Sequence, residues 1–204
     1  EPLSCTNPTK ISRLKLYSIA TMKSQSRFKT GSPVRESFPK NVLREAEKFG
    51  SHIKQQDTIG REDCRSDSVI SIDPASALDL DDAFSLQRTR GGRWKLRVHV
   101  ADVSHYVKAN SLIDREARLR GNSTYLVDRV IPMLPSSLSN GLCSLHPDAD
   151  RLTKCVEFTL TSEGKVLETR FFSALIRSKR RFYFLFKDIN YIYPIIFRKV
   201  GITF

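Results

Sequence analysis

The chain has 204 residues, of which 40% are hydrophobic and 27% are charged. This composition is close to that of ordinary globular domains, so it excludes a wholly disordered chain and allows one sizeable core. The net charge of +12 comes from the two ends, because residues 61–170 carry as many acidic as basic groups. Basic flanks suit a polyanionic partner, and charge alone leaves nucleic acid and a membrane surface both open.

The four cysteines are widely spaced and contain no C-x-x-C pair. This spacing argues against a zinc knuckle and against a disulfide scaffold, and it favours reduced thiols. No run approaches the ~18 uncharged apolar residues of a membrane helix, and the N-terminus has no apolar signal-peptide block. The sequence therefore predicts a cytoplasmic monomer without a membrane partner.

The first part of the chain predicts a basic arm followed by a helix. Residues 1–37 are rich in Ser, Thr, Lys and Arg, and we expect a flexible arm with one short strand at 11–20. A helix is expected to begin near residue 38, because apolar residues recur at helical spacing as far as Ile53. Residues 69–72 then predict a short strand, which Asp73-Pro74 ends.

The following residues predict two hairpins with a helix between them. Strands are expected at 83–86 and 94–103, joined at Gly91-Gly92, and at 155–161 and 165–177. Between the hairpins, 111–120 predicts a helix that Ser111 caps and Gly121 ends, and 131–145 predicts loop and short helix. Because the strands come in hairpin pairs, we expect an α+β fold with a largely antiparallel sheet and flanking helices.

Four aspartates within ten residues form the most informative pattern in the sequence: Asp73, Asp79, Asp81 and Asp82. Carboxylates this close repel one another, and a divalent cation such as Mg²⁺ is the simplest partner that neutralises them. An EF-hand is excluded, because Phe84 stands where its glycine is required and Arg90 where its glutamate is required. A turn with solvated carboxylates stays open as the alternative interpretation.

The aspartates belong to the first of a series of motifs that occur in order between residues 38 and 181. The motifs are residues 71–84, 98–107, 120–126, 131–135, 138–145 and 150–152. Together they resemble the catalytic (RNB) domain of the ribonuclease II and ribonuclease R family, with the bacterial ribonuclease R branch the most similar. The resemblance covers the N-terminal half of that domain, and it divides the chain into 1–37, 38–181 and 182–204.

The resemblance implies a Mg²⁺-dependent 3′→5′ exoribonuclease that hydrolyses single-stranded RNA to nucleoside 5′-monophosphates. It implies that all four aspartates form the metal site. In this site Asp73 and Asp82 are ligands, Asp79 supports them, and Asp81 is the catalytic residue that matters most to the chemical step. It also implies that Tyr125 packs against the 3′-terminal nucleotide of the RNA partner.

The resemblance ends near Arg181, and residues 182–204 form an aromatic-rich tail without family likeness. The second half of the family domain, which carries an arginine that grips the phosphate, has no counterpart in this sequence. We therefore expect a truncated domain whose own activity stays open. The alternative function is a non-catalytic, RNA-binding remnant of such an enzyme.

Several basic and titratable residues allow more than one interpretation. The arginines at 115, 118, 120 and 129 and the basic segment 177–181 could contact phosphates or form a solvated charged surface. His99 and His105 lie beside strands without metal-ligand spacing, which favours structural roles. Asp102 is expected to order the turn near the aspartates rather than to bind metal.

Overall fold

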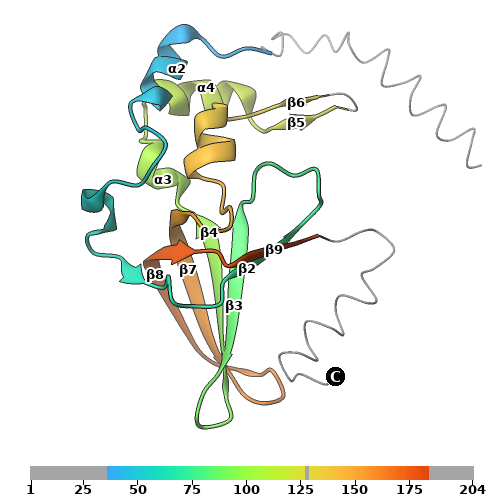
Figure 1. Ribbon diagram of the computed structural model, residues 1–204. Helices are drawn as coiled ribbons and strands as arrows, with labels where there is room; N and C mark the ends of the chain where they lie inside the picture. Colours follow the sequence, from blue (N-terminus) through green and yellow to red (C-terminus); the bar gives the residue numbers. More distant parts are fainter. Residues whose placement is uncertain (1–35, 127–128, 184–204) are drawn as a thin grey trace, which may run out of the picture. The chain divides into compact units, whose positions relative to one another are not determined.

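The computed structural model describes residues 36–126 and 129–183 (Figure 1). The predicted strand at 11–20, nearly all of the predicted arm and most of the predicted tail lie outside these residues. The described chain has the predicted α+β fold, with a large, mostly antiparallel sheet and few helices. No helix within the described residues is long and apolar enough to cross a membrane.

In chain order, the helices and strands are α2 (Lys40–Glu47), a 3₁₀ turn (Gln55–Thr58), β1 (Glu62–Asp63), β2 (Ile70–Asp73), β3 (Asp82–Arg88), β4 (Trp94–Ala101), α3 (Val103–Tyr106), α4 (Leu112–Arg120), β5 (Thr124–Tyr125), β6 (Val130–Ile131), a π-helical segment (Ser137–Leu142), β7 (Asp150–Leu160), β8 (Val166–Arg177) and β9 (Arg180–Tyr183). Among the described residues, seven strands form one sheet in the order β1-β8-β7-β4-β3-β2-β9, and β5 pairs with β6. The β1–β8 and β2–β9 pairs are parallel, and the other pairs are antiparallel.

Both predicted hairpins and the predicted central helix are confirmed. Gly92 (φ 76°) lies in the turn between β3 and β4, and Gly164 (φ 85°) lies in the turn between β7 and β8. These left-handed conformations explain why glycine stands at both turns. In α4 the Ser111 hydroxyl accepts a hydrogen bond from the Asp114 amide at 3.1 Å, and Gly121 ends the helix with φ 77°.

The first predicted helix is shorter than its apolar periodicity indicates. The helix α2 ends at Glu47, and Gly50 then turns the chain with φ 75°. Phe49 and Ile53 still pack against the core, but they do so from the segment after the helix. The periodicity therefore indicates which side chains are buried, whereas Gly50 determines where the helix ends.

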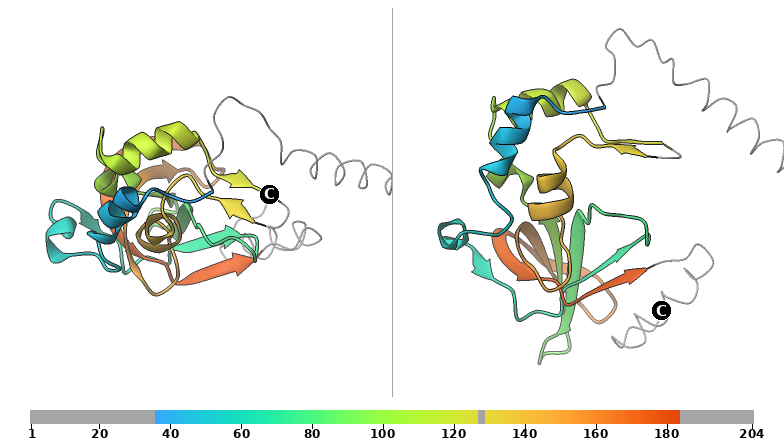
Figure 2. Two further views of the ribbon diagram at one scale, coloured as in Figure 1. Left: turned by 90° about the horizontal axis from the view of Figure 1, so that it is seen from above. Right: turned by 45° about the horizontal axis from the view of Figure 1, so that its top comes forward.

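The two faces of the main sheet differ in burial, while the helices lie near one end of the long strands (Figures 1 and 2). Strand pairing aligns Ala83, His99, Cys155 and Phe172 in one row, and the first three are buried. On the opposite face, pairing aligns four large apolar residues across β3, β4, β7 and β8. They are Phe84, Val98, Val156 and Phe171. Phe171 is 79% exposed, so the described core lies mainly on the first face.

His99 gives this core a dependence on pH. Its side chain is fully buried, and Nδ1 lies 3.1 Å from Thr153 Oγ1. Burial lowers the pKa of His99 from 6.5 to about 4. The unfolded chain therefore takes up this proton below pH 6.5, whereas the folded chain takes it up only near pH 4. The stabilisation by neutral His99 is complete above pH 6.5 and is lost as pH falls toward 4, which costs about 3 kcal/mol.

Urea unfolding at pH 7 and near pH 4 measures this loss. His99→Gln removes the titration while keeping a polar side chain beside Thr153, so its free energy of unfolding should change less between the two pH values than that of the wild type. An equal loss in both proteins would assign the pH dependence to other groups.

Candidate functional site

The four aspartates lie on one segment, Asp73–Asp82, which leaves the end of β2 and enters the start of β3; we call it the aspartate loop. Pro74 follows Asp73 and favours an extended conformation at that residue, which suits the last position of a strand. Inside the loop, Leu80 is fully buried. The apolar anchor lies between Asp79 and Asp81, so the core fixes the loop at the point where its carboxylates are densest.

The four carboxylates act on one another electrostatically. Burial and the negative charges of Asp79, Asp82 and Asp73 raise the pKa of Asp81. One carboxylate oxygen of Asp73, Oδ2, is buried and has no hydrogen-bond partner among the described residues. A buried oxygen without a donor, beside several negative charges, is the chemical setting that a hard divalent cation satisfies. The residues present therefore fit Mg²⁺ in donor type and in charge.

The side chains do not form a closed set of ligands as they stand. Within residues 36–126 and 129–183, no group of three or more His, Cys, Asp and Glu side chains is arranged to hold a metal ion. The assignment of Asp73, Asp79, Asp81 and Asp82 as metal ligands therefore stays a prediction.

Tyr125 lies beside the aspartate loop although 46 residues separate it from Asp79. Its hydroxyl donates a hydrogen bond to Asp79 Oδ2 at 2.8 Å. This hydrogen bond, burial and the charges of Asp79 and Asp81 raise the pKa of Tyr125, so the hydroxyl keeps the proton that it donates. The residue stands in β5 and is 63% exposed. The predicted RNA-contacting aromatic and one predicted metal-site carboxylate thus lie together.

Backbone and side-chain groups from other elements hold the aspartate loop. Ser144 Oγ accepts a hydrogen bond from the Leu80 amide at 2.9 Å and donates one to the Leu78 carbonyl at 3.0 Å. The Leu145 amide donates to the Leu80 carbonyl at 2.9 Å, and the Ala101 amide donates to the Asp81 carbonyl at 2.9 Å.

Arg181 of β9 holds the first half of the loop. Its guanidinium donates hydrogen bonds to the carbonyls of Pro74 and Ala77. No local motif in the sequence indicates these contacts of Arg181 and Ser144, although Ser144 lies within the family-like segment 138–145.

The other candidate residues take mainly structural positions. Asp102 is buried and pairs with Arg61 Nη2 at 2.7 Å, which fits its predicted role in ordering the turn. Arg120 is a correction: it pairs with Glu116 at 3.0 Å and both side chains are only 5% exposed, so Arg120 is not available to a phosphate. Arg118 pairs with Asp114 on the surface.

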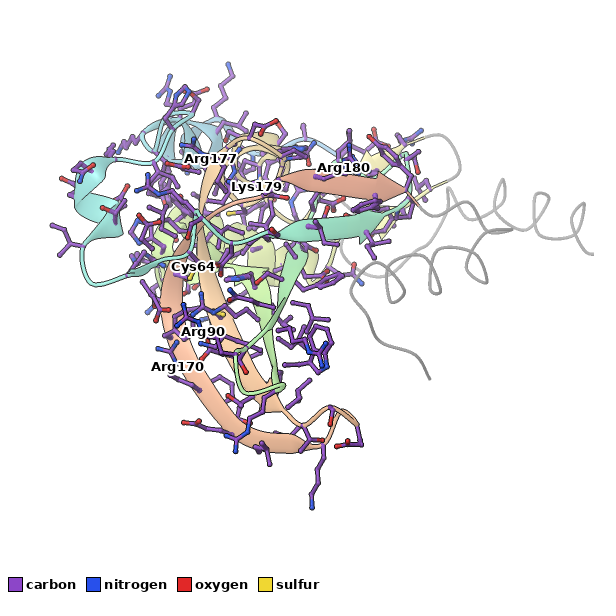
Figure 3. The ribbon with its side chains drawn as sticks, turned by 60° about the horizontal axis from the view of Figure 1, so that its bottom comes forward. Cys64, Arg90, Arg170, Arg177, Lys179 and Arg180 are labelled. Atoms are coloured by element: carbon purple, nitrogen blue, oxygen red, sulfur yellow. The ribbon has the colours of Figure 1, made fainter. Side chains whose placement is uncertain are left out.

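The residues of the basic segment 177–181 have different partners. Arg177 Nε donates to Asp150 at 2.7 Å, whereas Lys179 and Arg180 are exposed at the entry to β9 (Figure 3). Arg181 is turned instead toward the aspartate loop. Only part of this segment therefore presents positive charge to a polyanion.

Comparison with known proteins gives consistent matches. The RNB domain model matches residues 61–186. Ribonuclease R of Thermotoga maritima is 46% identical over 144 residues, which are 71% of this chain and 20% of that protein. Two structures of Mycoplasma genitalium RNase R match with TM-score 0.70 and 30% identity over 89% of this chain. One is in complex with ribose-methylated single-stranded RNA and the other with double-stranded RNA, and the match covers 27% and 31% of those chains.

Proposed function

This chain belongs to the RNB domain family, and from that premise we propose that it carries the metal site of a Mg²⁺-dependent 3′→5′ exoribonuclease. The proposed reaction is hydrolysis of single-stranded RNA to nucleoside 5′-monophosphates. Its curated relatives are ribonucleases, and the chain spans 20% of the length of the Thermotoga maritima protein. The cytoplasmic location and the monomeric state stay predictions.

The contact between Tyr125 and Asp79 is the observation that carries the proposal. It joins the residue predicted to pack on RNA to a residue predicted to support the metal, at 2.8 Å. Since the exposed ring lies beside the carboxylates, a base stacked on Tyr125 would bring its adjoining phosphate to the same place. Stacking on an aromatic face tolerates every base, as removal of successive nucleotides requires.

The aspartates supply the chemical part of the proposal. Asp73 and Asp82 are the proposed ligands, and the buried Oδ2 of Asp73, which has no hydrogen-bond partner within the described residues, provides an oxygen for the cation. Asp79 accepts the Tyr125 hydrogen bond and so orients the ring toward the site. Asp81 lies beside three other carboxylates, and burial and their charges raise its pKa, so its negative charge is unfavourable without a cation. When bound, Mg²⁺ supplies charge stabilisation at the phosphate and a more acidic water.

The test uses single-stranded RNA labelled at its 5′ end, incubated with the purified chain and MgCl₂ or with EDTA. If this chain is sufficient for activity, the RNA shortens progressively from its 3′ end and releases mononucleotides with Mg²⁺, and it does not react with EDTA. A covalently closed circle of the same RNA should stay intact, because an exonuclease requires a free end.

Cleavage of the circle, or equal degradation in EDTA, would contradict the proposal. Binding of the RNA without hydrolysis would support the non-catalytic, RNA-binding alternative instead. Fluorescence anisotropy of the same labelled RNA separates these outcomes, because it reports binding whether or not cleavage occurs.

A further inference from the structure

Two side chains that are remote in sequence hold the backbone of the aspartate loop from opposite ends of that loop. We propose that Ser144 and Arg181 are positioning residues that fix the loop in a shape able to bind Mg²⁺. The inference deepens the proposed function and rests on it for the identity of the ion. Its structural part, the hold on the loop, depends only on the hydrogen bonds of these two side chains.

Ser144 fixes the peptide groups on both sides of Asp79. Its hydroxyl donates to the Leu78 carbonyl and accepts from the Leu80 amide, so one side chain uses its donor and an acceptor on the loop. The residue is fully buried, as is Leu80. Water cannot easily replace either hydrogen bond at such a place, and loss of the hydroxyl would leave a buried amide and carbonyl unpaired.

Arg181 fixes the half of the loop that follows Asp73. The strands β9 and β2 run in parallel and align Ser71 with Arg181, which brings the guanidinium to the turn where the Ala77 amide donates to the Pro74 carbonyl. The guanidinium donates to both of those residues' carbonyls. Both hydrogen bonds come from one guanidinium nitrogen, Nη2, whose two N–H groups have fixed directions in the guanidinium plane.

The contacts of Ser144 and Arg181 oppose the electrostatic repulsion between the carboxylates of the aspartate loop. Four carboxylates in ten residues repel one another, and a loop without external contacts would separate them. Separation lowers the energy of the metal-free protein, and it moves the carboxylate oxygens further from the positions in which they could share one ion. Residues that orient ligands without touching the metal commonly contribute 10–100-fold to its affinity. Arg181 also adds a positive charge beside the acidic loop.

The chain contains a matched control for each residue. Arg180 is the neighbour of Arg181 and has the same charge, but its guanidinium lies over Phe182, 5.8 Å from the ring centre, rather than on the loop. Ser178 is buried like Ser144, but its hydroxyl has no hydrogen-bond partner among the described residues. Arg180→Ala and Ser178→Ala therefore repeat the loss of charge or hydroxyl without releasing the loop.

Two measurements test the inference in the full chain. Titration calorimetry with MgCl₂ alone should show Mg²⁺ affinity lowered by about 10–100-fold in Arg181→Ala and in Ser144→Ala, with both controls close to the wild type. Arg181→Lys should be intermediate, because it keeps the positive charge and a donor nitrogen but loses the planar geometry of the guanidinium. Amide hydrogen exchange without metal should be faster at Ala77 in Arg181→Ala and at Leu80 in Ser144→Ala.

The two measurements separate the inference from the proposed function. If the wild type does not bind Mg²⁺, the proposed metal dependence is wrong and so is the functional half of the inference, while hydrogen exchange still decides whether the two residues hold the loop. Exchange at Ala77 and Leu80 that matches the controls would overturn the inference, as would Mg²⁺ affinities equal to those of the controls. Should Arg181→Ala fail to fold, the comparison of Arg181→Lys with Arg180→Lys answers the same question.

Discussion

Asp81→Asn is expected to abolish Mg²⁺-dependent hydrolysis of RNA while leaving the metal-free fold as stable as the wild type or more stable. Burial and the charges of Asp79, Asp82 and Asp73 raise the pKa of Asp81, so its negative charge is unfavourable when no cation is present. Asparagine has the same shape without that charge. The substitution thus removes repulsion from the free protein and removes the group that a cation would need.

The expected loss of activity is at least about 10²–10³-fold, the range typical for removal of one electrostatic contact to a transition state. The assay is the Mg²⁺-dependent release of mononucleotides described above, and the melting temperature is measured in EDTA. Asp148→Asn is the matched control: Asp148 is exposed and has φ 61°, a conformation that asparagine tolerates well. Full activity in Asp81→Asn would assign any hydrolysis to residues outside the aspartate loop.

The hairpins and the aspartate set could be predicted from the sequence because their signals are local. Alternation of apolar and polar residues marks β4, and a glycine at each turn marks where β3 meets β4 and where β7 meets β8. The aspartates lie within ten residues, so their mutual repulsion follows from the chain alone. Charge repulsion between near neighbours needs no knowledge of the fold.

The contacts that complete the site could not be predicted in the same way. The strand β9 pairs with β2 across more than a hundred residues, and β1 contributes two residues to the edge of the sheet beside β8. Strands this short carry too little periodicity to be recognised. Arg181 therefore read as part of a basic segment, and Ser144 as one residue of a loop. Their partners are backbone carbonyls and an amide, and sequence patterns do not reveal such partners because almost every residue carries these groups.

Arg120 illustrates how burial reverses an interpretation based on charge. In the sequence it stands among other arginines, where it could contact a phosphate or belong to a solvated charged surface. In the fold its guanidinium pairs with Glu116, donates to the Pro132 carbonyl and lies 3.7 Å from the ring centre of Phe38. An arginine that packs on an aromatic ring and bonds to protein acceptors is part of the scaffold. The composition of a basic cluster thus gives an upper limit to its surface charge.

Arg61→Ala is expected to reduce the free energy of unfolding by about 3–5 kcal/mol, because it leaves a buried carboxylate without its main partner. The Arg61 and Asp102 side chains are 8% and 2% exposed and lie 2.7 Å apart. Burial pushes the pKa of Asp102 upward, but hydrogen bonds from Ser104 and Arg61 and the charges of Arg61 and Lys154 outweigh it and lower the pKa overall. Asp102 therefore stays ionised in the folded protein and needs a cation beside it.

Urea unfolding of three variants distinguishes this mechanism from a general loss of packing. Arg65→Ala is the surface control, since Arg65 is 41% exposed and its ion pairs should contribute only about 0–1 kcal/mol. Arg61→Met/Asp102→Leu removes both charges and should recover much of the stability that Arg61→Met alone loses. A double variant no more stable than that single variant would mean that the arginine acts through packing, not through the buried charge.

The Arg61–Asp102 ion pair is connected to the aspartate loop through the end of β4. Asp102 directly follows β4, and its amide donates to the Leu152 carbonyl of β7 at 2.9 Å. The preceding residue, Ala101, holds the Asp81 carbonyl at 2.9 Å. When Arg61 is lost, opening should therefore begin at this end of β4 and reach the loop before the rest of the sheet. Hydrogen exchange of the Arg61→Ala protein should show the Ala101 amide exchanging faster than the amides in the middle of β4; uniform exchange along the strand would contradict this order of opening.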